Sequence, residues 1–127
     1  MRRNNPAGRD RHGAWRRGRR AEALCVWLLR LRGWRILARD YRVAVGEIDI
    51  IARRGSVIAA VEVKARTAAG AAAEAVTPRQ RRRVARAFEH FLARRPPPPG
   101  CVLRFDVMLV APSRLPRQIV DAWRVGE

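Results

Sequence analysis

GEIDIIARRGSVIAAVEVKAR, residues 46–66, contains two apolar runs that are separated by Arg54 and Gly55. Both runs are rich in Val, Ile and Ala, and charged residues interrupt them at alternate positions. This pattern predicts two β-strands, residues 47–53 and 56–66, that are joined as a hairpin. The Arg-Gly pair is the expected two-residue turn of that hairpin.

The register of this hairpin decides which side chains meet, because neighbours along a strand point to opposite faces of the sheet. With Arg53 opposite Ser56, one face collects only apolar residues, namely Ile48, Ile50, Ala52, Val57, Ala59, Val61 and Val63. The other face carries Glu47, Asp49, Glu62 and Lys64, with Ile51, Ile58 and Ala60 nearer the turn. A shift by one residue would place the acids of one strand among the valines of the other. The sequence therefore predicts that Asp49 and Glu62 lie on the same side of the sheet.

Carboxylates that share one side of a hairpin repel each other unless a positive charge lies between them. An arginine could supply that charge in a salt bridge, and so could Mg²⁺, which prefers carboxylate oxygens and keeps several waters. Lys64 is the only lysine, since 27 of the 28 basic residues are arginine. A compact ammonium can orient a water and offset developing charge, which a planar guanidinium does less well. We expect Lys64 to act in a site with the two acids, although a chance survival of one lysine is the simpler alternative.

The remaining chain predicts a mixed α/β sheet that is flanked by helices. A three- and four-residue apolar spacing indicates a helix over residues 17–32, which Gly33 ends. A second helix is expected over residues 77–94, with Thr77, Pro78 and Gln80 placed as in a capping box. Further strands are expected over residues 34–43, 102–111 and 118–125, and residues 67–76 are expected to form a loop. The predicted order is α-β-β-β-α-β-β.

The bulk properties fit one domain of ordinary size. We expect residues 1–16 to form a flexible basic arm and residues 17–127 to form a single domain. The two cysteines have no Cys-x-x-Cys spacing, which favours a reducing, cytoplasmic compartment over a disulfide framework or a zinc site. No stretch approaches the ~20 apolar residues of a membrane span, so no membrane insertion is expected.

The net charge of +17 favours a polyanionic partner. DNA, RNA or an anionic membrane surface would fit, and an acidic protein partner is an alternative. A GC-rich genome would explain the preference for arginine, but it would not explain the excess over acids. The densest group of cations is on the second predicted helix, where Arg81 is accompanied by the candidate phosphate-binding residues Arg79, Arg82, Arg83 and Arg86. A solvated helix face is the simpler explanation of that group.

Gly46-Glu47-Ile48-Asp49, followed by Glu62-Val63-Lys64, resembles the PD-(D/E)xK motif of the restriction-endonuclease-like superfamily. Over about residues 17–123 the chain resembles the YraN family of small bacterial proteins and, more distantly, the archaeal Holliday-junction resolvases. The matching blocks are GRRAEAL, GWRILARDYR, GEIDIIA, VEVKAR, AVTPRQRRR and RFDVMLV, in that order. The resemblance implies a restriction-endonuclease-like core, in agreement with the order of elements predicted above.

The resemblance also implies roles for individual residues. Asp49 and Glu62 would be ligands of Mg²⁺ or Mn²⁺, the Val63 carbonyl could add a ligand, and Lys64 would be the catalytic lysine. Glu22 matches an additional acid on the first helix, although a first-turn acid is also favoured by the helix dipole. Two residues are expected beside the ligands rather than on the metal: Glu47, which a salt bridge could hold instead, and Gln80, which could simply cap its helix.

Other polar residues receive mostly structural expectations. Asp106 is expected to pair with a nearby arginine, and His12 and His90 are expected at the surface rather than as ligands. Arg66 is a candidate phosphate contact or a plain exposed arginine. Trp15 and Trp34 could stack on bases, but burial in the core or at its rim is the stronger expectation.

The sequence thus favours a metal-dependent nuclease that acts on DNA, including branched or processed intermediates of repair and recombination. A nucleic-acid-binding module that keeps the fold without cutting, and works beside a helicase or repair protein, is the first alternative. A basic RNA-associated protein is the second. No apolar pattern in the sequence specifies an oligomeric state.

Overall fold

The computed structural model describes residues 6–65 and 76–126, with side chains from residue 18 onward. The elements follow the predicted order, and their bounds are α1 (Pro6–Leu31), β1 (Arg35–Val43), β2 (Gly46–Arg54), β3 (Val57–Ala65), α2 (Pro78–Arg94), β4 (Val102–Val110) and β5 (Arg117–Ile119). The predicted loop at residues 67–76 and the candidate phosphate contact Arg66 lie outside the described residues, apart from Val76. No helix in the described part of the chain is long and apolar enough to cross a membrane.

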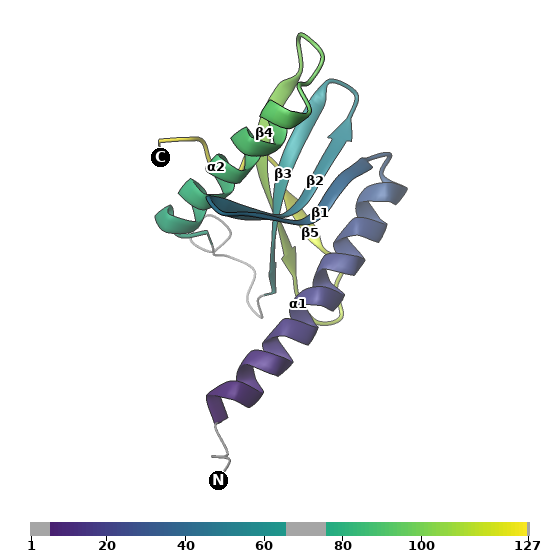
Figure 1. The fold of residues 1–127 in the computed structure, drawn as a ribbon. Helices are drawn as coiled ribbons and strands as arrows, with labels where there is room; N and C mark the ends of the chain where they lie inside the picture. Colours follow the sequence, from purple (N-terminus) through teal and green to yellow (C-terminus); the bar gives the residue numbers. More distant parts are fainter. Residues whose placement is uncertain (1–5, 66–75, 127) are drawn as a thin grey trace.

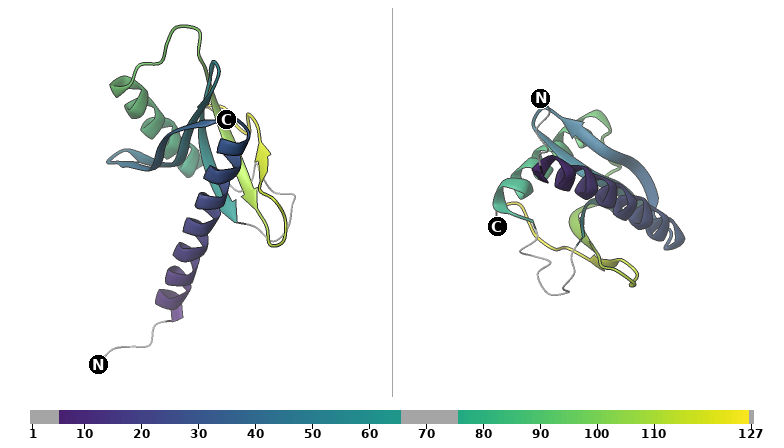
Figure 2. Two further views of the ribbon diagram at one scale, coloured as in Figure 1. Left: turned by 90° about the vertical axis from the view of Figure 1, so that its right-hand side faces the viewer. Right: turned by 90° about the horizontal axis from the view of Figure 1, so that it is seen from below.

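The five strands form one mixed sheet in the order β1-β2-β3-β4-β5. The first three strands are antiparallel neighbours, β3 and β4 are parallel, and β5 adds an antiparallel edge. A parallel pair needs a long crossover connection, and the chain between β3 and β4 contains α2 for this purpose. The two helices lie on opposite sides of the sheet, with α1 on one face and α2 on the other (Figures 1 and 2). The predicted mixed α/β sheet with flanking helices is confirmed.

Each helix covers its own hydrophobic core. On the α1 side, Cys25, Leu29 and Val61 are fully buried together with Met108 of β4. On the α2 side, the buried residues form a second cluster, namely Ile48, Ile51, Ile58, Ala60, Val76, Val84, Ala85, Ala87, Phe88, Phe91, Val107, Leu109 and Trp123. A strand with apolar residues on both faces is therefore buried on both faces, which explains the nearly continuous apolar runs of β2 and β3.

The ends of the helices show which local sequence signals were sufficient to predict a helix boundary. Thr77 and Gln80 form the predicted capping box, since each side chain bonds the other residue's backbone N–H at 3.2 and 3.1 Å. Gly33 ends α1 in the left-handed region with a φ of 88°. The predicted start of α1 near Arg17 is wrong, because the helix begins at Pro6, whose fixed φ suits a first helical turn. Residues 1–5 of the predicted arm lie outside the described residues.

Two strand predictions also need correction. The hairpin turn is Gly55-Ser56, with Arg54 opposite Val57, because Gly55 takes the positive φ (61°) that the first turn position requires. Both strands move by one residue relative to the prediction, so the sorting of faces near the turn is unchanged. The last strand ends at Ile119 rather than at residue 125, because Asp121 is left-handed (φ 52°) and its N–H bonds Asp106 at 3.0 Å.

α2 approaches the sheet very closely at Gly46, the first residue of β2. A Cβ atom at this position would overlap the backbone carbonyl oxygen of Arg83. We expect Gly46→Ala to lower the free energy of unfolding by about 1–3 kcal/mol, because the helix backbone must shift to make room. Chemical denaturation measures this change. The matched variant is Gly18→Ala, since Gly18 lies in α1 with open space around its Cα, and there the same change should be neutral or slightly stabilising. Equal effects of the two substitutions would contradict the prediction.

Candidate functional site

The pairing of β2 with β3 runs from Arg54↔Val57 to Ile50↔Val61, and the two acids of interest follow directly beyond it. Asp49 Oδ2 accepts a 2.8 Å hydrogen bond from the backbone N–H of Val63. In return, the carboxylate of Glu62 accepts a hydrogen bond from the backbone N–H of Asp49. Each acid is thus held by the backbone of the opposite strand. We call this end of the hairpin, with Asp49, Glu62, Val63 and Lys64, the fork.

The alternation of side chains along β2 breaks beside Asp49. Residues two apart on a regular strand share a face, yet Ile48 packs in the α2 cluster while Ile50 packs in the α1 cluster. The prediction that both lie on one face is therefore wrong. Beside this change of face, Asp40 of β1 has a left-handed φ of 48° between the pairs Arg39↔Ile50 and Tyr41↔Ile48, and the pairing register shifts between Ile36 and Ala38. Simple alternation therefore does not hold along β2 beside Asp49.

Asp49 faces a small polar hollow between α1 and the sheet. The hollow has a volume of about 170 Å³ and is lined by Gly18, Arg19, Glu22, Asp40, Arg42, Asp49 and Val63. Glu22, the candidate acid on the first helix, lines this hollow together with Asp49. Burial raises the pKa of Glu22 above its usual value, and the charges of Asp49 and Asp40 raise it further. Arg39 opposes this rise through a 3.6 Å ion pair with Glu22.

Glu62 is the most unusual group of the fork. It is 7% exposed, and its Oε1 is buried without a hydrogen-bond partner in the described part of the chain. Burial raises its pKa well above the usual value for a glutamate, the charge of Asp49 raises it further, and Lys64 lowers it. A buried carboxylate oxygen without a partner is costly, so either a proton or a cation is expected to neutralise it.

The charge of Lys64 acts on Asp49 as well as on Glu62. Burial raises the pKa of Asp49, while the hydrogen bond from Val63 and the charge of Lys64 lower it. Lys64 itself is half-buried, and within residues 18–65 and 76–126 its ammonium makes no hydrogen bond or close ion pair. Its ammonium therefore acts on both carboxylates through space and is not held by either of them.

The donor set of the fork fits a magnesium ion better than a metal that needs many protein ligands. No three His, Cys, Asp or Glu side chains come together as a metal-binding group in the described residues. Mg²⁺ needs only one or two carboxylates because it keeps several waters. Asp49 and the unpartnered oxygen of Glu62 are the two carboxylate groups of the fork that could fill this role, and both are hard oxygen donors.

Two residues that were expected beside the ligands have structural partners. Glu47 is more than half exposed and pairs with Arg83 of α2 at 3.7 Å, so the salt-bridge alternative holds. Gln80 is occupied by the capping box with Thr77.

The arginines of α2 point in different directions. Arg83 faces β2 through Glu47, and Arg81 is half-buried, with its guanidinium bonded to the Val76 carbonyl at 3.1 Å. Arg79, Arg82 and Arg86 are exposed. The predicted basic patch is therefore divided between at least two sides of the helix.

The remaining polar predictions also have answers in the structure. Asp106 is fully buried and accepts two 2.9 Å bonds from the Arg104 guanidinium, as expected for a structural pair. His90 is half-buried, and its Nδ1 lies 2.6 Å from the Tyr41 hydroxyl. Trp34 is buried at 3% exposure, below the guanidinium groups of Arg54 and Arg104. The side chains of His12 and Trp15 lie outside the described part.

Sequence reasoning missed Asp40 and Arg42, which line the hollow beside Asp49 and bond each other at 2.9 Å. A signal for Asp40 was present, because Asp is one of the few residues besides Gly that tolerate the left-handed region. Nothing in the sequence placed Arg42 at the site, since its strand was predicted without a register relative to β2.

Comparison with known proteins identifies relatives over nearly the whole chain. The family model described as "Uncharacterised protein family UPF0102" matches residues 21–110, which include the fork. A UPF0102 protein of Parvibaculum lavamentivorans is 52% identical over 97% of this chain and 91% of the relative. A UPF0102 protein of Paramagnetospirillum magneticum is 49% identical over 94% and 96%, and one of Sphingopyxis alaskensis is 50% identical over 90% and 97%.

The unpartnered oxygen of Glu62 predicts a pH-dependent stability change. In the metal-free protein, Glu62→Gln should raise the free energy of unfolding near pH 8 by roughly 1–3 kcal/mol, because it removes a buried charge whose Oε1 has no hydrogen-bond partner in the described structure. A carboxyl whose pKa is raised on folding destabilises the folded state as pH rises above its ordinary value of 4.5. The difference between the variant and the wild type should therefore shrink as pH falls below about 4.5.

Urea denaturation with chelator across this pH range measures the change. The exposed Glu89→Gln removes the same charge from α2 and should change stability little at any pH. A destabilising effect of Glu62→Gln at pH 8 would contradict the prediction.

Proposed function

The chain belongs to the uncharacterised protein family UPF0102, and we propose that it is a metal-dependent nuclease that hydrolyses DNA phosphodiesters at the fork. The observation that carries the proposal is the pair of carboxylates of Asp49 and Glu62, with one Glu62 oxygen buried and unpartnered and a lysine two residues farther on. Such a group is costly to a structure without a cation, and it suits a site that must hold one.

The resemblance of the segments at residues 46–49 and 62–64 to the PD-(D/E)xK motif supports this proposal. The YraN family and, more distantly, the archaeal Holliday-junction resolvases are the groups that the chain resembles. The net charge of +17 also supports a polyanionic substrate. Branched or processed DNA of repair and recombination is the substrate class that these likenesses favour.

Asp49 and Glu62 would hold Mg²⁺ or Mn²⁺, with the Val63 carbonyl as a further oxygen ligand. A bound Mg²⁺ supplies positive charge for the phosphoryl oxygens and lowers the pKa of a bound water. The protein's own part is to fix the two carboxylates, since the backbone N–H groups of Val63 and Asp49 hold one oxygen of each. Preorganised ligands lose little freedom when substrate arrives.

Lys64 would complete the site as a mobile positive charge. Its ammonium has no fixed partner in the described part of the chain, so it is available to a phosphate oxygen or to the attacking water. Glu22 lines the same hollow as Asp49, and burial, together with the charge of Asp49, raises its pKa above the usual value. These two groups would position the attacking water and its proton beside the scissile phosphate.

A nucleic-acid-binding module without cleavage is the second candidate. It is favoured by the lack of a group of three metal-ligating side chains in the described residues. In this role the basic surface would bind the phosphate backbone beside a helicase or repair protein. An RNA partner would be bound through its phosphates in the same way.

Cleavage separates these candidates. We expect the protein to cut a flap, junction or single-stranded DNA only with Mg²⁺ or Mn²⁺, and Asp49→Asn and Glu62→Gln each to lower the rate at least about 100-fold. Filter binding should show retained affinity, and calorimetry should show weakened metal binding by both variants. Glu47→Gln, an exposed acid near the fork, is the matched control and should keep activity within a few-fold. No cleavage of any of these substrates, together with no metal binding, would favour the module.

The role of the lone lysine has its own test. Lys64→Arg keeps the positive charge but replaces a compact ammonium with a planar guanidinium, so we expect cleavage to fall by about 10- to 100-fold. Circular dichroism and DNA affinity should be unchanged, because Lys64 makes no packing-critical bond in the described chain. Full activity of the variant would mean that position 64 requires only a charge.

A further inference from the structure

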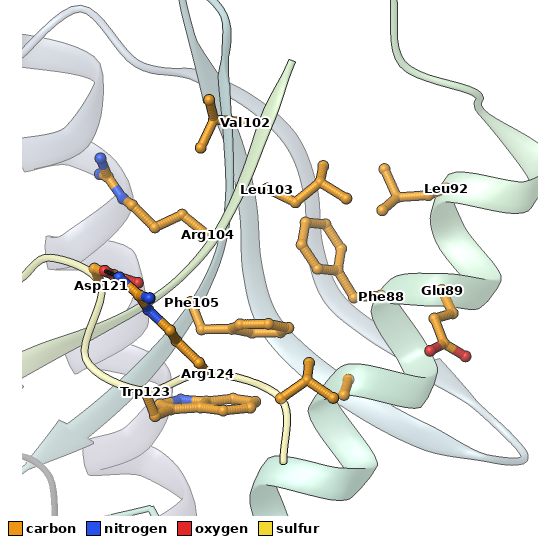
Figure 3. A pocket seen from close by; sticks show the side chains of 12 residues that line it. Phe88, Glu89, Leu92, Val102, Leu103, Arg104, Phe105, Asp121, Trp123 and Arg124 are labelled. Atoms are coloured by element: carbon orange, nitrogen blue, oxygen red, sulfur yellow. Dashed lines mark hydrogen bonds and ion pairs between the residues drawn. The ribbon is translucent and has the colours of Figure 1, made fainter. Parts of the chain in front are cut away.

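A second hollow lies between α2, the first half of β4 and the chain after β5 (Figure 3). Its volume is about 530 Å³, and none of the fork residues line it. The inner wall is aromatic: Phe105 stacks on Trp123 with ring centroids 4.0 Å apart, and Phe88 meets Phe105 edge-on at 5.6 Å. A concave apolar site of this size is typical of ligand-binding pockets.

The entrance of this hollow is apolar and open to solvent. Val102 and Leu103, at the start of β4, are 54% and 48% exposed, and Val125 is 68% exposed. Leu92 of α2 lies on the opposite side of the opening (Figure 3). Contiguous exposed apolar side chains around a concavity mark a surface that another molecule covers.

The hollow continues into a basic groove along α2. A neighbouring hollow of about 350 Å³ shares Ala85, Glu89 and Trp123 with the first, among other residues, and adds Arg82 and Arg86. These two arginines are exposed, lie one helical turn apart, and make no hydrogen bond or ion pair in the part of the chain that the structure describes. Glu89 is the one acid among the residues that line this groove.

A residue that lines both hollows has an unused hydrogen-bond donor. Trp123 lines both of them, is 2% exposed, and its Nε1–H has no acceptor in the described structure. Buried indole N–H groups usually have a partner, because an unsatisfied donor costs free energy.

We propose that this composite groove binds an acidic peptide segment of a partner protein, with one large apolar side chain of the peptide in the aromatic hollow. Its carboxylates would lie over Arg82 and Arg86, and charge complementarity with a chain of net charge +17 favours such a segment. An apolar anchor in a pocket, surrounded by charged contacts at the rim, is the usual arrangement of a peptide-binding site.

Two other occupants fit less well. A second copy of this chain would bring another charge of +17 to the same surface. A nucleobase needs an open aromatic face for stacking. Here Phe105 and Trp123 stack on each other, and Arg81 lies 5.9 Å from the Trp123 ring centroid.

Fluorescence polarisation with the full chain tests the proposal. The probe is a fluorescein-labelled peptide of four aspartates followed by Gly-Leu-Phe. One control peptide has asparagines in place of the aspartates, and another ends in Gly-Ser-Ser. We expect the probe to bind at least tenfold more tightly than either control peptide. Arg82→Gln combined with Arg86→Gln should weaken probe binding at least tenfold, whereas Arg20→Gln with Arg30→Gln, an equal loss of charge from exposed positions of α1, should change it less than threefold.

The apolar contribution is tested separately with Leu103→Ser, matched by Leu31→Ser on the exposed side of α1. Leu103→Ser should weaken probe binding at least fivefold, and Leu31→Ser should leave it unchanged. Equal binding of the three peptides, or probe binding that Leu103→Ser leaves unchanged, would overturn the proposal. A loss of single-stranded DNA binding in Leu103→Ser without a loss of probe binding would assign the groove to nucleic acid and would also overturn it.

Discussion

Two hydrogen bonds between backbone and carboxylate hold the most important region of this protein together. The N–H of Val63 binds Asp49, and the N–H of Asp49 binds Glu62, directly beyond the last regular pair of β2 and β3. In a continuing ladder these donors would bond backbone carbonyls instead. Because the ladder stops, the chain can bring two acids together without an arginine between them. The cost is a carboxylate oxygen of Glu62 that has no partner in the described structure.

The sequence predicted the strands of the fork well because side-chain alternation tolerates some errors. The turn was misplaced by one residue, but both strands moved together, so Ile50 and Val61 still share the face that was predicted for them. Ile48 could not be predicted in this way. It packs on the α2 side although Ile50 packs on the α1 side, and alternation within one hairpin carries no information about such an irregularity.

The basic residues of α2 show a different limit. A helical pattern places arginines on a face, but it does not say what that face meets. In the structure, Arg83 pairs with Glu47 at the start of β2, while Arg82 and Arg86 border the groove beside Trp123. This division depends on where β2 and the C-terminal segment lie against α2, and no local pattern in the sequence predicts it. The capping box, by contrast, depends on residues three positions apart and was predictable for that reason.

The close approach of Gly46 to the carbonyl of Arg83 limits substitution where α2 meets the sheet, but not on the outer side of α2. No side chain can replace the hydrogen at position 46 without moving the helix, so substitutions of Gly46 are disfavoured. The exposed arginines on the outer side of the same helix have no such packing constraint, so the helix can accept other residues at these positions. One helix therefore combines an inner surface that is fixed by its neighbour with an outer surface that is open to adaptation.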